Sequence, residues 1–316
     1  MRPVCVLGLG LIGGSVLKAA TRAGWEAFGV TLEPVADSRV EPTMAAALSR
    51  AAETDALIVL AVPLPSIDDV LREVAQHAPD CLLTDVVSVK QPVAEAVARR
   101  LPKARYAGGH PMAGKSASGW DAASESLFDE AAWVVTTDED TPHDAWRAAV
   151  DLALACGARV VPTTTGEHDA AVARISHLPH ILAAVLASTG ADGGSLALSL
   201  AAGSFRDGTR VMCTRPELVL AMCDGNRGPL LEAVDEALGR LGAARGALAS
   251  TGGLAATVRA GHDGRQALED LRNAEHEEFP IDLTDPEAFE SLRDLGTAGG
   301  HVLRMEGDTA ICALPA

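Results

Sequence analysis

Aromatic side chains are scarce in this sequence: they make up 3% of the 316 residues, with a single tyrosine. The interior must therefore be filled mainly by alanine, leucine and valine. Hydrophobic residues account for 48% of the sequence and charged residues for 22%, which is typical of globular rather than disordered chains. The length is sufficient for two domains that each bury a core.

Positive charge is also in short supply. Lysine and arginine number 26 against 43 aspartates and glutamates, which gives a formal net charge of -17 and a pI near 4.9. This balance argues against general binding to nucleic acid or to an anionic membrane surface. An anionic substrate would need cationic groups gathered at one place.

The six cysteines form no Cys-x-x-Cys pair, which favours small buried thiols in a reducing cytosol over a disulfide framework. No apolar run approaches the ~18 residues typical of a membrane span. The apolar start, "PVCVLGLGLIGGSVL", contains glycines and lacks a cleavage site, so it does not read as a signal peptide. We expect a soluble cytoplasmic protein.

What the first half does contain is an alternation of short β-type runs and alanine-rich helical patterns. Strands are expected at 4–8, 26–31, 56–62, 81–86, 105–109, 132–137 and 158–163. Helices are expected near 12–23, 66–77, 90–101 and 143–156. Near-continuous apolar strands separated by helices predict an α/β fold with a doubly wound parallel sheet covered on both faces.

Helical patterns dominate after residue 163. A capping box, with Thr164 as cap and Glu167 as its partner, opens a helix that is expected to run to Gly190 with a bend at Pro179. Further helices are expected over 195–202, 216–224, 228–250 and 252–273. We therefore predict three parts: a dinucleotide-binding domain at 1–163, an all-α substrate and dimerisation domain at 164–275, and a tail of uncertain structure at 276–316.

A glycine motif follows the first predicted strand and opens the first helix. In "VLGLGLIGGS", Gly8 permits a tight turn, Gly10 lets the backbone approach a pyrophosphate, and Gly13 allows the helix to pack closely on the strand. Leu11 and Ile12 lie in the same turn. The motif and its context predict a Rossmann dinucleotide site.

Two further strand ends bear on the cofactor. The second strand ends at Thr31 instead of the acid that usually holds the ribose of NAD, and Glu33 would repel a 2′-phosphate. NAD is therefore favoured, and NADP stays open. After the third strand, Val62 and Pro63 are expected to lie along the cofactor, although they would also suit a rigid strand exit.

Polar side chains follow the next two strands, where doubly wound sheets place their ligands. "TDVVSVK" offers Asp85, Ser88 and Lys90, and Asp85 is equally suited to cap the helix that follows. The glycine-lined segment "AGGHPMAG" carries His110. An imidazole is suited to take a proton near neutral pH.

The helical half contributes its own polar groups. His177 and His180 lie one turn apart on one helical face, and "AGSFRDGTR" carries Arg206 and Arg210. The histidines are alternatively core residues beside a kink. A metal site would need more ligands, and the His168–Asp169 pair lies more than two turns away, so no metal is expected.

Five separated motifs, in order, resemble the prephenate dehydrogenase family, and its actinobacterial branch especially: "GLGLIGGS", "LTDVVSVK", "GGHPMAG", "SHLPH" and "AGSFRDGTR". The likeness covers residues 1 to about 260, and the tail matches nothing recognisable. The resemblance implies oxidation of the ring hydroxyl of prephenate by hydride transfer to a nicotinamide. Loss of carbon dioxide then gives 4-hydroxyphenylpyruvate for tyrosine biosynthesis.

The resemblance also implies roles for individual residues. His110 matches the catalytic histidine that hydrogen-bonds the ring hydroxyl, and Ser88 the serine that orients that hydroxyl and the nicotinamide. Arg210 matches the arginine that grips a substrate carboxylate. His180 matches a pocket histidine near the carboxylates. Two more residues are assigned secondary roles in the substrate pocket. His177 is expected to support His180, and Arg206 fills a position that is basic in relatives.

Other functions stay open at this point. Relatives also accept arogenate or an amino analogue of prephenate, and the sequence does not separate these substrates. A β-hydroxyacid or imine reductase would use a lysine on the long helix, yet residues 164–190 contain none. A non-catalytic nucleotide-sensing dimer would bind NAD without turnover. Lys115 has no assigned role.

Overall fold

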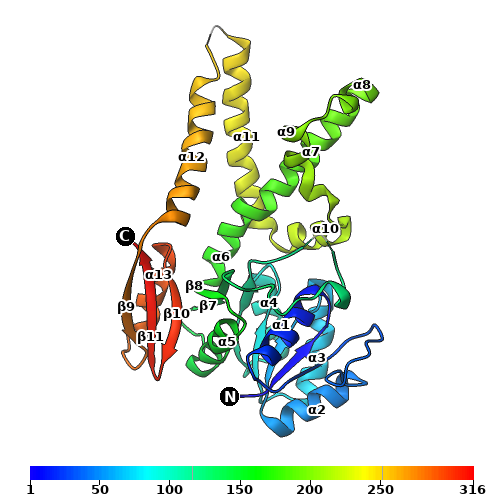
Figure 1. Cartoon of the computed structure of the whole chain (residues 1–316), viewed down its shortest axis with the longest axis vertical. Helices are drawn as coiled ribbons and strands as arrows, with labels where there is room; N and C mark the ends of the chain where they lie inside the picture. Colours follow the sequence, from blue (N-terminus) through cyan, green and yellow to red (C-terminus); the bar gives the residue numbers. More distant parts are fainter. Residues whose placement is uncertain (116, 251) are drawn as a thin grey trace. The chain divides into compact units, whose positions relative to one another are not determined.

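A computed structural model describes residues 1–115, 117–250 and 252–316 of the protein (Figure 1). Ser116, in the segment after His110, and Thr251 lie outside the described residues. The chain forms two compact units. Unit 1 comprises Met1–Asp169 and Glu278–Leu314, and unit 2 comprises Ala170–Glu277 and Pro315–Ala316.

The first sheet of unit 1 is parallel, with the strand order β2-β1-β3-β4-β5. Its strands are β1 (Val4–Leu7), β2 (Ala27–Val30), β3 (Leu57–Leu60), β4 (Leu82–Asp85) and β5 (Arg105–Ala107). Alternate residues enter separate cores: Val4 and Val6 face one, and Cys5 and Leu7 face the other. The predicted doubly wound arrangement is therefore confirmed.

Five helices accompany these strands. They are α1 (Leu11–Arg22), α2 (Met44–Thr54), α3 (Ile67–His77), α4 (Gln91–Arg100) and α5 (His143–Ala155). Four of them were expected from the sequence. The helix α2 was not, although the hydroxyl of Thr43 caps it by accepting a hydrogen bond from the backbone N–H of Ala46 at 3.1 Å.

A second, six-stranded sheet takes up the remaining strands in the order β6-β7-β8-β10-β11-β9. These are β6 (Gly109–Pro111), β7 (Ala132–Thr136), β8 (Arg159–Thr163), β9 (His276–Asp282), β10 (His301–Glu306) and β11 (Thr309–Pro315). The pair β7–β8 is parallel, whereas β6 and β10 run antiparallel to β7 and β8 respectively. The expectation of one parallel sheet was wrong for the strands after β5.

The expected strand at 105–109 breaks at Gly108, where the chain leaves the first sheet for the second. A Cβ on Gly108 would lie 3.0 Å from the Thr136 side chain, and one on Gly109 would lie 2.5 Å from the carbonyl oxygen of Asp85. No side chain larger than hydrogen fits there without movement of its neighbours. The two glycines therefore allow a crossing between sheets.

The tail folds as β9, α13 (Ala288–Thr297), β10 and β11. Strand β10 pairs with β8 through Val302 and Val160, and Phe289 and Leu292 of α13 join the core that contains Trp146. Unit 1 is therefore discontinuous in sequence, because residues 278–314 complete a sheet begun by residues 109–163.

Unit 2 is helical, as predicted for this half. Its elements are α6 (Thr165–Val172, shared with unit 1), a π-helical turn (Ala173–His177), α7 (Leu178–Asp192), α8 (Gly194–Ser199), α9 (Gly203–Thr209), α10 (Pro216–Gly225), α11 (Arg227–Ala249) and α12 (Ala255–Asn273). The capping box is confirmed: the Glu167 N–H donates to the Thr164 hydroxyl, and the Thr164 N–H donates to the Glu167 carboxylate, both at 3.2 Å. The irregularity expected at Pro179 is the π-helical turn that precedes it.

The helices of unit 2 bury little of their apolar surface. Within α11 only Leu230 and Ala233 are buried, and within α12 no residue is. Residues Thr165–Asp192 form a helix that is long and apolar enough to cross a membrane by length and composition alone, with 22% of its most apolar window buried. The sequence analysis expected no such segment. The expectation of buried thiols holds for Cys5, Cys81, Cys156 and Cys312, whereas Cys213 is exposed and Cys223 is half-buried.

Candidate active site

The glycine loop between β1 and α1 has the geometry that the motif predicts. Gly8 has a φ of +101°, and its N–H donates to the carbonyl of Val30 at 2.9 Å. A Cβ on Gly8 would lie 2.6 Å from the Ala61 carbonyl oxygen and 2.9 Å from Cγ1 of Val62. The loop therefore packs against the end of β3 with no room for a side chain.

The N-terminus of α1 is open to an anion. Gly10 is its exposed N-cap, a Cβ placed there would meet nothing within 4 Å, and the first turn holds no acidic residue. Leu11 and Ile12 begin the helix, half-buried, and a Cβ on Gly13 would overlap the carbonyl oxygen of Gly8. Free N–H groups and an uncompensated helix dipole fit a pyrophosphate here.

The residues expected along the rest of a dinucleotide follow β2 and β3. Thr31 is half-buried directly after β2, and its hydroxyl accepts a long hydrogen bond from the Glu33 N–H at 3.4 Å. The first arginine after Thr31 is Arg39, whose guanidinium donates to the carboxylate of Asp37 and, at 2.9 Å, to the hydroxyl of Thr21. Arg39 is thus engaged near the carboxyl end of α1. Half-buried Val62 and exposed Pro63 follow β3.

A buried ion pair organises the segment that carries Ser88. Asp85 and Lys90 are both fully buried and in contact, and Lys90 Nζ also donates to the carbonyl of Gly109 at 2.7 Å. Asp85 accepts further hydrogen bonds from the Val87 N–H at 2.7 Å and the Tyr106 hydroxyl at 2.6 Å. The pair therefore fixes the Ser88 segment to the start of β6.

Burial and neighbouring charge shift the pKa values of two groups in this cluster, Lys90 and Tyr106. Burial lowers the pKa of Lys90 against the opposing effect of Asp85. Burial, followed by the charge of Asp85 and the hydrogen bond to it, raises the pKa of Tyr106 well above its usual value. Ser88 itself is half-buried between β4 and α4. A neutral phenol is thus kept as a hydrogen-bond donor to Asp85.

His110 lies on strand β6 rather than in a loop. Its backbone pairs with Val134 of β7, and its half-buried ring reaches toward α6. There His110 Nδ1 lies 2.8 Å from Nε2 of His168, and His168 Nδ1 lies 2.7 Å from Oδ1 of Asp169. From the sequence, His168 and Asp169 were considered only as metal ligands, and this contact was not predicted.

Asp169 also supplies the cap of α4. Its two carboxylate oxygens accept hydrogen bonds from the backbone N–H groups of Lys90 at 2.8 Å and Gln91 at 2.9 Å. The suggestion that Asp85 caps this helix was therefore wrong, because the capping carboxylate belongs to Asp169, 79 positions beyond Lys90.

The segment after β6 returns to the nucleotide helix. The hydroxyl of Ser15 accepts from the Ser124 N–H at 3.0 Å, and Lys18 Nζ donates to the Ala123 carbonyl at 2.9 Å. The same ammonium lies 4.5 Å from the ring centroid of Trp120. Strand β6 and helix α1 are thus linked through this segment. Lys115 within it is exposed.

The other predicted site residues belong to unit 2. His177 is fully buried, with Nδ1 3.1 Å from Nδ2 of Asn226, and it closes the π-helical turn. Asn226 was not predicted from any sequence motif. His180 is half-buried, and its Nδ1 lies 2.8 Å from the carbonyl oxygen of Ser176, so Nδ1 carries the donated proton. Among the described residues, Nε2 of His180 has no hydrogen-bond partner.

The two arginines of the segment "AGSFRDGTR" are both exposed cationic groups. Arg206 lies in the last turn of α9 and Arg210 directly follows it; both are exposed. Within residues 1–115, 117–250 and 252–316, no carboxylate lies within ion-pair distance of either guanidinium. Both cationic groups are therefore available to an anion.

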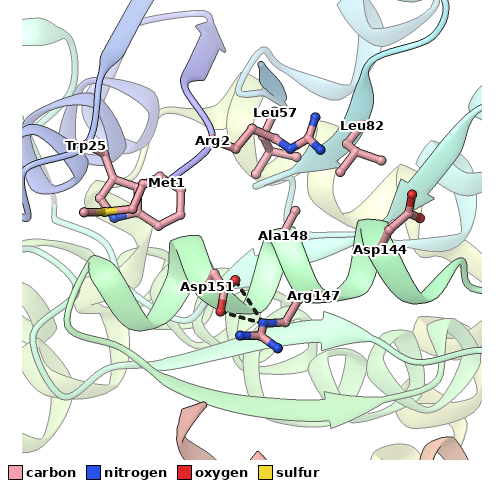
Figure 2. Close-up of a pocket in the computed structure, with 9 residues that line it drawn as sticks. All are labelled: Met1, Arg2, Trp25, Leu57, Leu82, Asp144, Arg147, Ala148 and Asp151. Carbon is pink, nitrogen blue, oxygen red and sulfur yellow. Dashed lines mark hydrogen bonds and ion pairs between the residues drawn. The ribbon is translucent and has the colours of Figure 1, made fainter. Parts of the chain in front are cut away.

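A cavity of about 450 Å³ lies elsewhere on unit 1 (Figure 2). It is lined by the first residues of β3 and β4 and by α5, where Arg147 Nε binds both carboxylate oxygens of Asp151 at 2.9 and 3.0 Å. These are the amino ends of the parallel strands. Ligands of doubly wound sheets bind at the carboxyl ends, so the cavity is separate from the candidate site.

Fold and site together define a class: two-unit proteins with a doubly wound dinucleotide-binding domain and a helical domain. A family model for the prephenate dehydrogenase nucleotide-binding domain matches residues 35–162, and one for the prephenate dehydrogenase dimerization domain matches residues 164–252. The chain belongs to the prephenate dehydrogenase family.

Individual relatives agree with this assignment. A prephenate dehydrogenase of Bacillus subtilis is 31% identical over 74% of this chain and 66% of its own length. A cyclohexadienyl dehydrogenase of Zymomonas mobilis is 30% identical over 79% of this chain and 89% of its own length. The chain thus spans about two thirds of the Bacillus protein and most of the Zymomonas protein.

Solved structures show the same fold. One from Corynebacterium glutamicum, provisionally assigned as a prephenate dehydrogenase, has a TM-score of 0.88 at 45% identity and covers 95% of this chain and 98% of its own. A prephenate dehydrogenase of A. aeolicus, solved with hydroxyphenyl propionate and NAD+, has a TM-score of 0.71 at 20% identity and covers 86% of this chain and 96% of its own.

Proposed function

We propose that this protein oxidises prephenate to 4-hydroxyphenylpyruvate, with hydride transfer to NAD, in tyrosine biosynthesis. Membership of the prephenate dehydrogenase family supports the reaction. The observation that carries it for this chain is the placing of His110: a half-buried imidazole, fixed on β6 and hydrogen-bonded through Nδ1, beyond the carboxyl end of the parallel sheet.

His110 is the base in this proposal. It accepts the proton of the ring hydroxyl as the carbonyl forms, at a pH where an imidazole is largely neutral. Ser88, held beside β6 by the Lys90 contacts, orients the same hydroxyl. A nicotinamide, when bound, accepts the hydride that the ring carbon loses. The carbon–carboxylate bond then breaks, and carbon dioxide leaves as the ring becomes aromatic.

The glycine loop supplies the cofactor site. The open space at Gly10 and the acid-free first turn of α1 would receive the pyrophosphate. That turn is completed by Gly8, Leu11, Ile12 and Gly13. The rest of the dinucleotide would be lined by Thr31, Val62 and Pro63. NAD is favoured over NADP because Arg39 is already engaged and Glu33 would repel a 2′-phosphate.

Two arginines and a histidine are the proposed ligands of the substrate's carboxylates. Arg210 is the first candidate, because its exposed guanidinium can bind two oxygens of one carboxylate. His180, with Nε2 unencumbered, is the second, and Arg206 contributes positive charge nearby in sequence. Buried His177 supports the helix that carries His180, through Asn226. We assign no metal ion to this chemistry.

A second copy of this chain is the proposed partner of unit 2. Four exposed leucines, 59–69% accessible, follow one stripe of α11: Leu231, Leu238, Leu241 and Leu248. A stripe of this kind on a helix that buries two residues needs cover, and the dimerization-domain match supports a homodimer. We expect a protein partner rather than a membrane to cover the exposed apolar side chains of the helix Thr165–Asp192. The net charge of -17 disfavours binding to nucleic acid. We propose that the protein is cytoplasmic.

A single experiment tests the reaction, the substrate and the cofactor together. Purified protein is assayed by reduced-nicotinamide absorbance with prephenate and with arogenate, each with NAD and with NADP. Turnover of prephenate with NAD is expected. Faster turnover of arogenate or of NADP would reassign the substrate or the cofactor, and NAD binding without turnover of either substrate would favour a nucleotide-sensing dimer.

A further inference from the structure

Three side chains form a hydrogen-bonded line that ends at the proposed base. Asp169 Oδ1 lies 2.7 Å from His168 Nδ1, and His168 Nε2 lies 2.8 Å from His110 Nδ1. The two rings meet edge to face, 5.1 Å apart at 74°. His168 and Asp169 are 2% exposed, whereas His110 is only half-buried. The line thus runs from the interior toward the accessible ring.

The donor and acceptor roles along this line follow from the carboxylate. An ionised carboxylate only accepts hydrogen bonds, so Nδ1 of His168 must donate to Asp169. Nε2 of a neutral His168 then lacks a hydrogen and accepts from Nδ1 of His110. Neutral His110 therefore carries its proton on Nδ1, which leaves Nε2 as its basic nitrogen.

We propose that His168 and Asp169 are positioning residues for the reaction, which set the tautomer of His110 and stabilise its protonated form. The inference rests on the proposed function, because it assumes that His110 is the base. When His110 Nε2 takes the substrate proton, the Nδ1–H bond to His168 persists and the new positive charge faces a neutral ring backed by a carboxylate. The role is the one that an orienting group plays behind any catalytic imidazole.

Asp169 is itself held in the ionised form by its neighbours. Burial raises its pKa, but hydrogen bonds from His168 and from the backbone N–H groups of Gln91 and Lys90 more than compensate, so the pKa is lowered overall. The other charged or titratable groups of this cluster are Lys90 and Asp85, an ion pair, and Tyr106, which donates to Asp85. Asp169 is thus a fixed carboxylate at the inner end of the line.

The tautomer can be measured without any substrate. Protein labelled with 15N-histidine is examined by two-bond 15N–1H correlation NMR at pH 8, with His110→Gln and His168→Gln used to assign the signals. We expect His110 as the Nδ1–H tautomer in the wild-type protein, and loss of that preference in His168→Ala. An Nε2–H tautomer for wild-type His110 would overturn the proposal, whatever the enzyme turns out to oxidise.

Kinetics then test whether the line matters to turnover. His168→Ala is expected to lower kcat ~10–100-fold while KM for prephenate changes by less than about threefold, since the effect is on the base. His168→Gln can still accept from His110 Nδ1 through its amide oxygen and should recover part of the loss. In Asp169→Asn, the acid limb of the pH profile of kcat/KM should move to lower pH by at least ~0.5 unit, because the protonated base loses support.

The control is His77→Gln on α3, a helix that carries none of the proposed site residues, which should leave kcat and the pH profile unchanged. Wild-type kcat and an unshifted profile in both His168→Ala and Asp169→Asn would overturn the proposal. A wild-type protein that does not oxidise prephenate would refute the proposed function instead, and the NMR result would still stand as a separate test of the hydrogen-bonded line. Helical content by circular dichroism identifies a variant that fails to fold, and His168→Gln then carries the kinetic test.

Discussion

Gly13→Ala is expected to damage both the fold and the cofactor site, whereas Gly10→Ala should damage the cofactor site alone. A Cβ on Gly13 would overlap the Gly8 carbonyl oxygen and lie 2.8 Å from the Ala61 Cβ. Normal carbon contacts are about 3.5–4.0 Å, so α1 must move on the order of 1 Å away from the sheet. Overpacking at this level costs up to about 3 kcal/mol. The better helix propensity of alanine returns about 1 kcal/mol.

The net loss of about 2 kcal/mol should lower the Tm of unit 1 by about 4–8 °C, the shift expected for a domain of roughly 150–250 residues. At Gly10 an added Cβ meets nothing within 4 Å and φ is -76°, so alanine fits. Because alanine is a poorer N-cap than glycine, a loss below about 1 kcal/mol is expected there. The methyl group would nevertheless stand where the pyrophosphate must approach.

The assay is a pair of measurements on each variant. Thermal unfolding followed by circular dichroism without cofactor gives Tm, and isothermal titration calorimetry gives the Kd for NAD. Both variants should bind NAD at least ~10-fold more weakly, a loss of about 1.4 kcal/mol. Wild-type Tm in Gly13→Ala would refute the packing argument, and undiminished NAD affinity in Gly10→Ala would refute the placement of the cofactor.

Four further predictions follow from the site and the surfaces. His110→Asn should lower kcat by ~10²–10⁴-fold, the usual effect of losing a general base, with NAD affinity nearly unchanged; near-normal turnover would contradict its role. Arg210→Ala should raise KM for prephenate at least ~10-fold, because the anion loses a bidentate partner; an unchanged KM would argue against that contact. Leu241→Glu should convert dimer to monomer in analytical ultracentrifugation, and a variant that stays dimeric would move the interface off α11. The pKa of Asp37 is lowered from 3.8 to about 2, mainly by the side-chain hydrogen bonds from Arg39. The pair therefore stabilises the fold above pH 4, and this stabilisation is lost as the pH falls toward 2. Asp37→Asn should therefore lose about 1 kcal/mol at pH 7 but almost nothing near pH 2 in urea unfolding, and a pH-independent loss would rule out the ionic explanation.

Sequence patterns predicted the first sheet well because four of its strands, β1 to β4, contain short apolar runs, and a glycine or polar residue lies at or just past the end of β1, β2 and β4. Gly8, Thr31 and Ser88 accordingly lie just past strand ends, as expected. The same patterns do not say which sheet a strand joins. The run at 105–109 looked like one strand, but the absence of side chains at Gly108 and Gly109 lets the chain change sheets there.

The contact of His110 with His168 could not be predicted from the sequence either, because it also depends on which strands pair. The two residues are 58 positions apart, and the contact depends on β6 pairing with β7, on β7 pairing with β8, and on α6 following β8 directly. Periodicity within each segment carries no information on these pairings. The Asp169 cap of α4 is equally non-local, which is why a nearer carboxylate, Asp85, looked like the capping residue.

The six-stranded sheet has a consequence for the order in which the chain is made. Strand β6 holds His110, but its sheet also contains β10 and β11, which leave the ribosome after all the helices of unit 2. Every residue assigned to chemistry or to ligand binding precedes residue 211, yet that sheet is complete only when synthesis has reached residue 315, the end of β11. A stop codon near residue 275 would therefore remove no site residue and still leave the strand of the base in an unfinished sheet.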